Sequence, residues 1–89
     1  MLYKEIVANG TYTLKSQGGY LEGVVVNIPG SGTIQIADNT TAAAPFIAGA
    51  TAFALPAAGG FLNYNTHFST GLTIVIGSMV SGSITVTYY

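Results

Sequence analysis

Apolar and polar residues alternate with a period of two through several short segments of this 89-residue chain. Residues 72–76 and 84–89 show the alternation most fully, and residues 11–15 and 33–37 repeat it. A period of two places every second side chain on one face of a β-strand, so these segments are predicted to be strands with one buried face. The run at residues 24–28 is rich in β-branched side chains. It predicts a central strand covered on both faces.

Turn-forming residues separate these segments and leave no room for a long helix. Asn9-Gly10 predicts a two-residue hairpin turn, because both turn positions need positive φ, and it would join a strand near residues 2–7 to one near residues 11–15. No apolar stripe with a helical period survives the glycine and proline spacing. The three alanines at 42–44 allow one helical turn at most.

Seven or eight short strands, spaced at roughly 8–12 residues, are typical of an antiparallel sandwich or a small barrel. We therefore expect an all-β fold, an antiparallel β-sandwich of the jelly-roll or small-barrel type. The chain is short enough for one domain, which would span residues 1–89. The closing segment at residues 83–89 would offer its backbone to another subunit if it lies at a sheet edge.

Charged residues are unusually scarce. Soluble domains carry about 25% Asp, Glu, Lys and Arg, whereas this chain has 6% and no arginine. The five charged residues are Lys4, Glu5, Lys15, Glu22 and Asp38. Nucleic acids and anionic membrane surfaces need clustered Lys or Arg, so neither is an expected partner. The absence of cysteine excludes disulfides and thiolate metal sites.

An uncharged stretch at residues 42–62 is as long as a membrane-spanning helix, which needs about 20 residues. Pro45 and Pro56 interrupt it, and no Lys or Arg flanks it. A buried or partner-covered extended segment is the preferred interpretation, and a membrane-active segment is the alternative. The first residues lack the apolar region of a secretory signal, which predicts a chain made in the cytoplasm.

Catalytic and metal-binding groups are sparse. His67 is the only histidine, and no serine lies in a nucleophile-elbow context. Asp38-Asn39 is expected to form a turn in which the side chains bond their own backbone. The glycine-rich segment at residues 29–32 leads into a strand, whereas a phosphate-binding loop leads into a helix. We therefore predict a protein that is not an enzyme and uses no cofactor or metal.

Aromatic residues are the main candidates for binding, because interfaces are enriched in them. The candidate interface residues are Phe46, Phe53, Phe61, Tyr64, Phe68, Tyr88 and Tyr89. The alternative is that most of them fill the core of the sandwich. A carbohydrate-binding site is a further alternative, with exposed aromatics around Tyr64 and His67 and with Asn63 and Asn65 as polar partners.

Four segments resemble small virion proteins of tailed bacteriophages: residues 19–21, 24–39, 68–73 and 84–88. The resemblance implies a small all-β structural protein of the virion, such as a capsid decoration or cement protein. It further implies homo-oligomers, with trimers favoured by analogy, and the major capsid protein or another virion protein as partner. Such proteins assemble in the host cytoplasm, which agrees with the missing secretory signal.

Two functional hypotheses follow. The first is a non-enzymatic capsid decoration protein that bridges shell subunits, with contacts from residues 46–61 and 83–89. The second is a carbohydrate- or receptor-binding module of a tail or fibre. Because residues 39–89 carry no charged side chain, we also expect a charged, solvent-facing N-terminal portion and a neutral portion covered by partners.

Overall fold

The computed structural model describes residues 2–28, 32–54, 60–77 and 82–89, with only the backbone described at residues 28 and 50–54. These residues form eight strands and no helix. In chain order the strands are β1 (Leu2–Ile6), β2 (Gly10–Lys15), β3 (Gly19–Ile28), β4 (Thr33–Ala37), β5 (Phe46–Ala54), β6 (Gly60–Phe68), β7 (Leu72–Gly77) and β8 (Ser83–Tyr88). The predicted all-β fold is confirmed.

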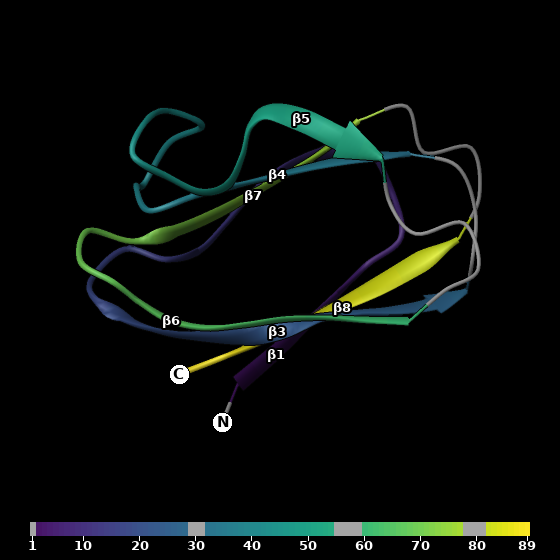
Figure 1. Ribbon diagram of the computed structural model, residues 1–89, viewed down its shortest axis with the longest axis horizontal. Coiled ribbons are helices and arrows are strands. Elements are labelled where there is room, and N and C mark those ends of the chain that lie inside the picture. The colour runs from purple at the N-terminus through teal and green to yellow at the C-terminus, as the bar shows by residue number, and fades with distance from the viewer. Residues whose placement is uncertain (1, 29–31, 55–59, 78–81) are drawn as a thin grey trace.

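The strands form two antiparallel four-stranded sheets that pack face to face (Figure 1). One has the order β1-β8-β3-β6 and is called the β1 sheet here; the other has the order β2-β7-β4-β5 and is called the β2 sheet. Strands equally far from the two chain ends pair with each other: β1 with β8, β2 with β7, β3 with β6 and β4 with β5. This pairing is that of one long hairpin rolled into two sheets, which is the jelly roll.

The predicted hairpin at Asn9-Gly10 is wrong. β1 pairs with β8 in one sheet, and β2 pairs with β7 in the other, so the turn carries the chain between sheets. The hydroxyl of Tyr12 donates a hydrogen bond to the carbonyl oxygen of Ala8 at 2.7 Å, which ties β2 to this crossing. The local turn signal identified a reversal of the chain, but the burial of two apolar faces decided which strands pair.

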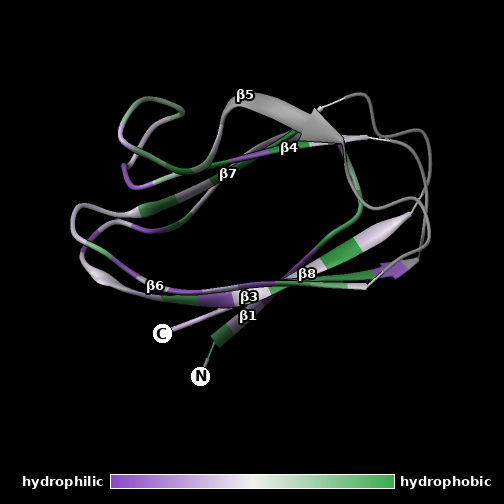
Figure 2. Ribbon diagram, in the orientation of Figure 1, coloured by the Kyte–Doolittle hydropathy of each residue, from purple (hydrophilic) through white to green (hydrophobic). Residues whose placement is uncertain are grey.

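The core lies between the sheets and is built from every second residue of the strands. Figure 2 shows the hydrophobic and hydrophilic residues alternating along them. The buried apolar cluster contains Ile6, Leu21, Val24, Val26, Ile34, Ile36, Phe68, Leu72, Ile74, Ile76, Ile84, Val86 and Tyr88. Each buried aliphatic side chain contributes about 1.5–3 kcal/mol relative to exposure, so this cluster supplies most of the stability.

Two strands differ from the expectation, β3 in the burial of its outer face and β8 in the pairing of its edges. β3 is central, as predicted, but only its inner face is covered: Val24 is fully buried, Val25 is half-buried and Asn27 is exposed. β8 lies between β1 and β3, so both of its edges are hydrogen-bonded within the chain. Edge pairing of residues 83–89 with another subunit is therefore excluded.

The expected division into a charged N-terminal portion and a neutral C-terminal portion does not occur. In the β1 sheet, the charged strands β1 and β3 alternate with the uncharged strands β8 and β6. The jelly-roll pairing joins early strands to late ones, so charge that is unevenly distributed along the sequence becomes interleaved in space. Any spatial asymmetry has to be sought between the faces of the sandwich.

Candidate functional site

Six of the seven aromatic candidates have described side chains, and these are buried, half-buried or exposed. Phe68 and Tyr88 are buried core residues, and the Tyr88 hydroxyl lies 3.5 Å from the carbonyl oxygen of Leu14. Tyr64 is half-buried against the core, and burial raises the pKa of its hydroxyl above the ordinary value. Phe46 is half-buried at the start of β5, whereas the side chain of Phe53 lies outside the described residues.

Among the six candidates whose side chains are described, two are strongly exposed: Phe61 keeps 49% of its surface accessible and Tyr89 keeps 48%. Both belong to the outer surface of the β1 sheet. For Phe68 and Tyr88, a core role replaces the expected interface role, because their positions in β6 and β8 direct them between the sheets. The exposed pair defines where the search for a site has to begin.

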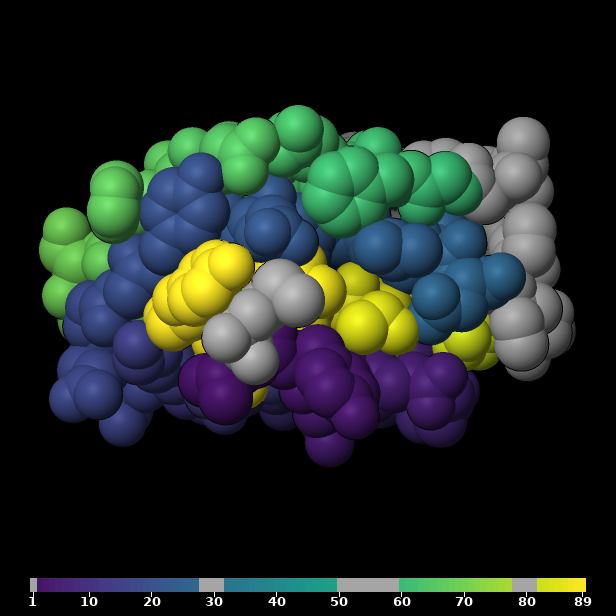
Figure 3. All heavy atoms as spheres, turned by 90° about the horizontal axis from the view of Figure 1, so that it is seen from below, coloured from purple at the N-terminus to yellow at the C-terminus, as the bar shows by residue number. Residues whose placement is uncertain are grey.

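A row of rings crosses the outer surface of the β1 sheet. Tyr20 on β3 pairs with His67 on β6, and their rings meet edge to face with centroids 5.0 Å apart. On the other side, the ring of Tyr89 lies 6.0 Å from that of Tyr20, and the two backbones exchange hydrogen bonds of 3.2 and 2.8 Å. Figure 3 views this surface directly, with β1, β8, β3 and β6 side by side in that order.

Phe61 and Tyr3 extend the same surface. Phe61 pairs with Val25, and its ring lies across Gly23: a Cβ atom on Gly23 would come within 2.5 Å of the ring and of the Leu62 carbonyl oxygen. The missing side chain at residue 23 therefore lets the ring lie against the sheet. Tyr3 pairs with Thr87 and is 73% exposed. We call the surface formed by Tyr3, Tyr20, Phe61, His67 and Tyr89 the aromatic face.

Side-chain amides hold part of the aromatic face in place. The hydroxyl of Tyr20 donates to Oδ1 of Asn65 at 3.0 Å, and Nδ2 of Asn65 donates to Oδ1 of Asn63. Asn65 has a φ of 45°, in the left-handed region that asparagine tolerates better than most residues. These bonds fix the orientation of the Tyr20 ring.

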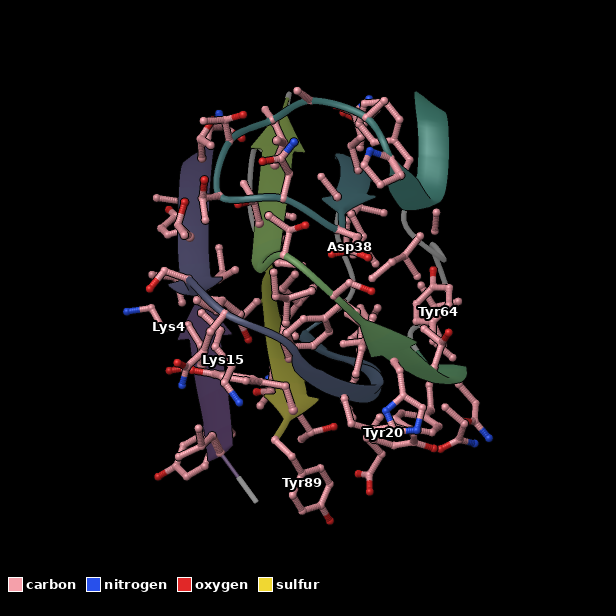
Figure 4. The ribbon with its side chains drawn as sticks, turned by 90° about the vertical axis from the view of Figure 1, so that its left-hand side faces the viewer. Lys4, Lys15, Tyr20, Asp38, Tyr64 and Tyr89 are labelled. Atoms are coloured by element: carbon pink, nitrogen blue, oxygen red, sulfur yellow. The ribbon has the colours of Figure 1, made fainter. Side chains whose placement is uncertain are left out.

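The pairing expected for a carbohydrate site is not formed. Along β6, His67 is exposed, whereas Tyr64 is half-buried and packs against the core, so the two residues lie on opposite faces of the strand. The aromatic partner of His67 is Tyr20. Figure 4 shows Tyr20 and Tyr89 together, with Tyr64 apart from them.

Two carboxylates lie on the aromatic face, and both lysines lie elsewhere. Glu5 is exposed opposite Thr85, and Oε1 of Glu22 accepts a hydrogen bond from Thr87 at 3.2 Å. Lys4 pairs with the buried Val86, so it belongs to the inner side of edge strand β1. Lys15 ends β2 and donates to the carbonyl oxygen of Tyr89 at 2.9 Å (Figure 4).

The outer surface of the β2 sheet has a different chemistry. Its exposed and half-buried positions include Thr11, Thr13, Gln35 and Val75, and we call the surface that these four form the neutral face. The segment at residues 39–45 covers one end of this sheet. It leaves Thr73 fully buried, although Thr73 alternates with the core residues of β7.

Hydrogen bonds attach the covering segment to the sheet. The Thr73 hydroxyl donates to the Asn39 carbonyl oxygen at 2.8 Å, and the Thr13 hydroxyl donates to that of Thr40 at 3.1 Å. The backbone N–H of Asp38 donates to the carbonyl oxygen of Pro45 at 2.8 Å, which closes the segment at its base. The chain thus covers part of its own neutral face.

Asp38 anchors this segment to the turn between β6 and β7. Its carboxylate accepts hydrogen bonds from the backbone N–H groups of Ser69 at 2.9 Å and Thr70 at 2.8 Å, with Gly71 at 3.4 Å. Partial burial of the Asp38 carboxyl would raise its pKa, but the N–H groups of Thr70, Ser69 and Gly71 more than offset this and hold the pKa below its ordinary value.

The bonds made by Asp38 differ from the predicted Asx turn. Asn39 does bond locally, because its Oδ1 accepts from the N–H of Thr40 at 2.7 Å. Asp38 instead reaches a turn 31 to 33 residues away. Its role is to join the two sheets at the β6–β7 connection, which short-range reasoning could not reveal.

Sequence reasoning did not select Tyr20 and Glu22 for the site. One signal pointed to them: Gly23 lies inside β3, just before its apolar run, and a glycine inside a strand often marks a close approach by another group. The close approach here is that of the Phe61 ring, and Tyr20 and Glu22 precede Gly23 in the same strand. The ring row itself depends on pairings between β8, β3 and β6.

The geometry supports binding by a surface. Within the described ranges no pocket is found. In the same part of the chain, no three His, Cys, Asp or Glu side chains come together as a metal site would need. Nor do the described residues include a helix long and apolar enough to cross a membrane. What the face offers is exposed rings, amides and two carboxylates on a sheet.

Comparisons with models of protein families, with curated proteins and with solved structures find no match to this chain.

Proposed function

We propose that this protein is a non-enzymatic structural component of an assembly, a capsid decoration protein of a phage virion that acts by self-association and by bridging shell subunits. One observation carries the proposal: three large apolar side chains are exposed together on one sheet face, with Tyr3 at 73%, Phe61 at 49% and Tyr89 at 48%. Exposed apolar patches of this kind mark interaction surfaces.

The size of the faces supports this role. A stable interface of ordinary size uses about 800 Å² of each partner, which is roughly a fifth of the 4389 Å² accessible surface of the chain. A sandwich has two outer sheet faces, and although residues 39–45 cover one end of the β2 sheet, each face can take part in a separate contact. Jelly rolls recur in viral capsid and lectin domains, although a shared fold alone does not establish a shared function.

The edge of β1 argues against self-association by sheet extension. Lys4 is exposed on this edge strand, and charged side chains, lysine above all, are one of the ways in which proteins prevent edge-to-edge pairing. Identical copies are better joined through the neutral face. Its residues Thr11, Thr13, Gln35 and Val75 carry no charge, so no like charges would meet there.

Light scattering over a concentration series tests self-association, and antibody detection of the protein in purified virus particles tests its location. We expect oligomers and a fixed ratio of this chain to the shell protein. Thr11→Glu should dissociate the oligomers, because it places like charges in the neutral-face contact. Asn63→Glu, on the aromatic face, is the matched control and should leave them intact. A protein that stays monomeric at all concentrations and is absent from particles would contradict the proposal.

A further inference from the structure

We propose that the aromatic face binds a partner surface that presents arginine or lysine side chains. This inference rests on the proposed function. It names the chemistry of the partner that would bind the aromatic face while copies of the chain associate through the neutral face.

The charged side chains that point outward on this face are both carboxylates. Glu5 and Glu22 lie on it, whereas Lys4 belongs to the other side of β1. The ammonium group of Lys15 lies at the end of the face, where it donates to the Tyr89 carbonyl oxygen. The cross-strand neighbour of Glu5 is Thr85, which carries no charge. Two of the three carboxylates of the chain therefore point outward from this face.

The rings are ordered before any partner arrives. Tyr20 is held by its hydrogen bond to Asn65 and by ring contacts to His67 and Tyr89, and Phe61 lies against the backbone at Gly23. Cationic side chains are attracted to the faces of aromatic rings, with arginine the more frequent partner. Rings beside carboxylates therefore suit a guanidinium or ammonium group, which can contact a ring and pair with Glu22 or Glu5.

The same charge disfavours other occupants. If a second copy packed the same face against this one, Glu5 and Glu22 would meet their own equivalents, and such juxtaposition of like charges suppresses association. Phosphate groups of nucleic acids or anionic lipids would be repelled for the same reason. The chain therefore uses chemically different surfaces for its own copies and for its partner.

Chemical-shift mapping of amide resonances on the full-length protein tests the assignment. The probes are a short synthetic peptide that alternates Arg with Gly, the same peptide with Glu in place of Arg, and a neutral oligosaccharide of N-acetylglucosamine. We expect the Arg peptide alone to shift residues 19–27, 61–67 and 85–89. Its binding should be largely lost at roughly 1 M salt, where the screening length falls to about 3 Å.

Variants distinguish the effect of a carboxylate on the aromatic face from the effect of the net charge of the chain on peptide binding. Tyr20→Ala and Glu22→Gln should each weaken binding of the Arg peptide about two- to fivefold. The double variant Glu22→Gln with Thr41→Glu keeps the net charge of the chain but moves the carboxylate to the exposed segment over the β2 sheet. It should bind as weakly as Glu22→Gln alone.

Three results would overturn the proposal: no shifts on the aromatic face, full recovery in the double variant, or salt-independent binding of the oligosaccharide to the same rings. The last would make the face a carbohydrate site. Failure here is distinguishable from failure of the proposed function. An oligomeric, particle-associated protein that ignores the Arg peptide contradicts only this inference, whereas a monomer absent from particles that binds the peptide contradicts only the proposed function.

Discussion

The two outer faces of the sandwich are built on the same strand geometry and yet differ in almost every other respect. The aromatic face of the β1 sheet carries exposed rings and two carboxylates, and no described segment covers it. The neutral face of the β2 sheet carries threonine, glutamine and valine, and residues 39–45 cover one of its ends. Among the described residues, one face is thus partly covered by the chain itself and the other is open.

The two faces differ because a few residues of the chain fix what each surface exposes. Thr73 is completely buried on the outer side of the β2 sheet because Asp38, Asn39 and Thr40 attach the covering segment to neighbouring strands. On the β1 sheet, the ring of Phe61 occupies the position that a side chain at residue 23 would fill, so the outer surface there is aromatic. The following predictions test how far each face depends on these few residues.

The largest effect is expected at the centre of the aromatic face. Gly23→Ala should lower the free energy of unfolding by about 3 kcal/mol, because the new Cβ would lie 2.5 Å from both the Leu62 carbonyl oxygen and the Phe61 ring. Urea denaturation measures this. Gly18→Ala is the matched control with a smaller loss, since its nearest contacts are at 3.2 Å. Adding Phe61→Ala should recover only part of the loss, because the carbonyl remains.

The next effect concerns the cover of the neutral face. Asp38→Ala should lower the free energy of unfolding by about 2 kcal/mol, because the N–H groups of Ser69 and Thr70 lose a charged acceptor. Asp38→Asn should lose less, since its side-chain oxygen still accepts one bond. Equal stability of Asp38→Ala and the parent protein would show that the segment is held without this residue.

The stabilisation that Asp38 gives to the segment at residues 39–45 should decrease in acid. The pKa of Asp38 is lower in the folded than in the unfolded chain, so the unfolded state takes up the proton first as the pH falls. The stability that Asp38 contributes is therefore fully present above the ordinary Asp value of 3.8 and is lost as the pH falls through the lower folded pKa. Denaturation of the parent protein and Asp38→Asn over a pH series should give curves that converge in acid.

A smaller effect is expected under the cover. Thr73→Val should cost about 1 kcal/mol, because it keeps the shape but removes the hydrogen bond to the Asn39 carbonyl oxygen. Hydrogen exchange should also become faster in residues 39–45. Thr11→Val, an exposed position in the same sheet, is the control and should stay within about 0.5 kcal/mol of the parent.

The smallest effect is expected at Ser83, at the start of β8. Its hydroxyl is buried and has no hydrogen-bond partner. Ser83→Ala removes this unsatisfied group, so the free energy of unfolding should stay within about 0.5 kcal/mol or rise slightly. A thermal melt is sufficient for the measurement. A loss as large as that of Thr73→Val would indicate that Ser83 has a bonding role.

Much of the fold followed from local pattern. Residues 72–76 and 84–88 are strands whose apolar members face the core, because alternation and burial act on the same side chains. Which strands pair with each other could not be predicted from the local pattern. Asn9-Gly10 has the composition of a hairpin turn, but β1 and β2 pair with β8 and β7, since those pairings let both strands bury their apolar sides in one core.

The candidate site could be predicted only in part from the sequence, for a related reason. Phe61 and Tyr89 were selected as aromatics and are exposed, whereas Phe68 and Tyr88 were selected equally and are buried. Composition makes no distinction among them; the distinction comes from which side of the strand faces the other sheet. Tyr20 and Glu22 were missed because their importance comes from neighbours on β6 and β8 that are distant in sequence.

By itself, the sequence determined that this protein is an all-β chain with an apolar core and very few charges, because a period of two and the composition are properties of neighbouring residues. The tertiary structure alone decided where those charges and rings are placed. By pairing early strands with late ones, it brings Tyr20, His67 and Tyr89 into one row and leaves Glu5 and Glu22 on the same face. Long-range pairing maximises burial of the core, and the surface chemistry of the two faces follows from it.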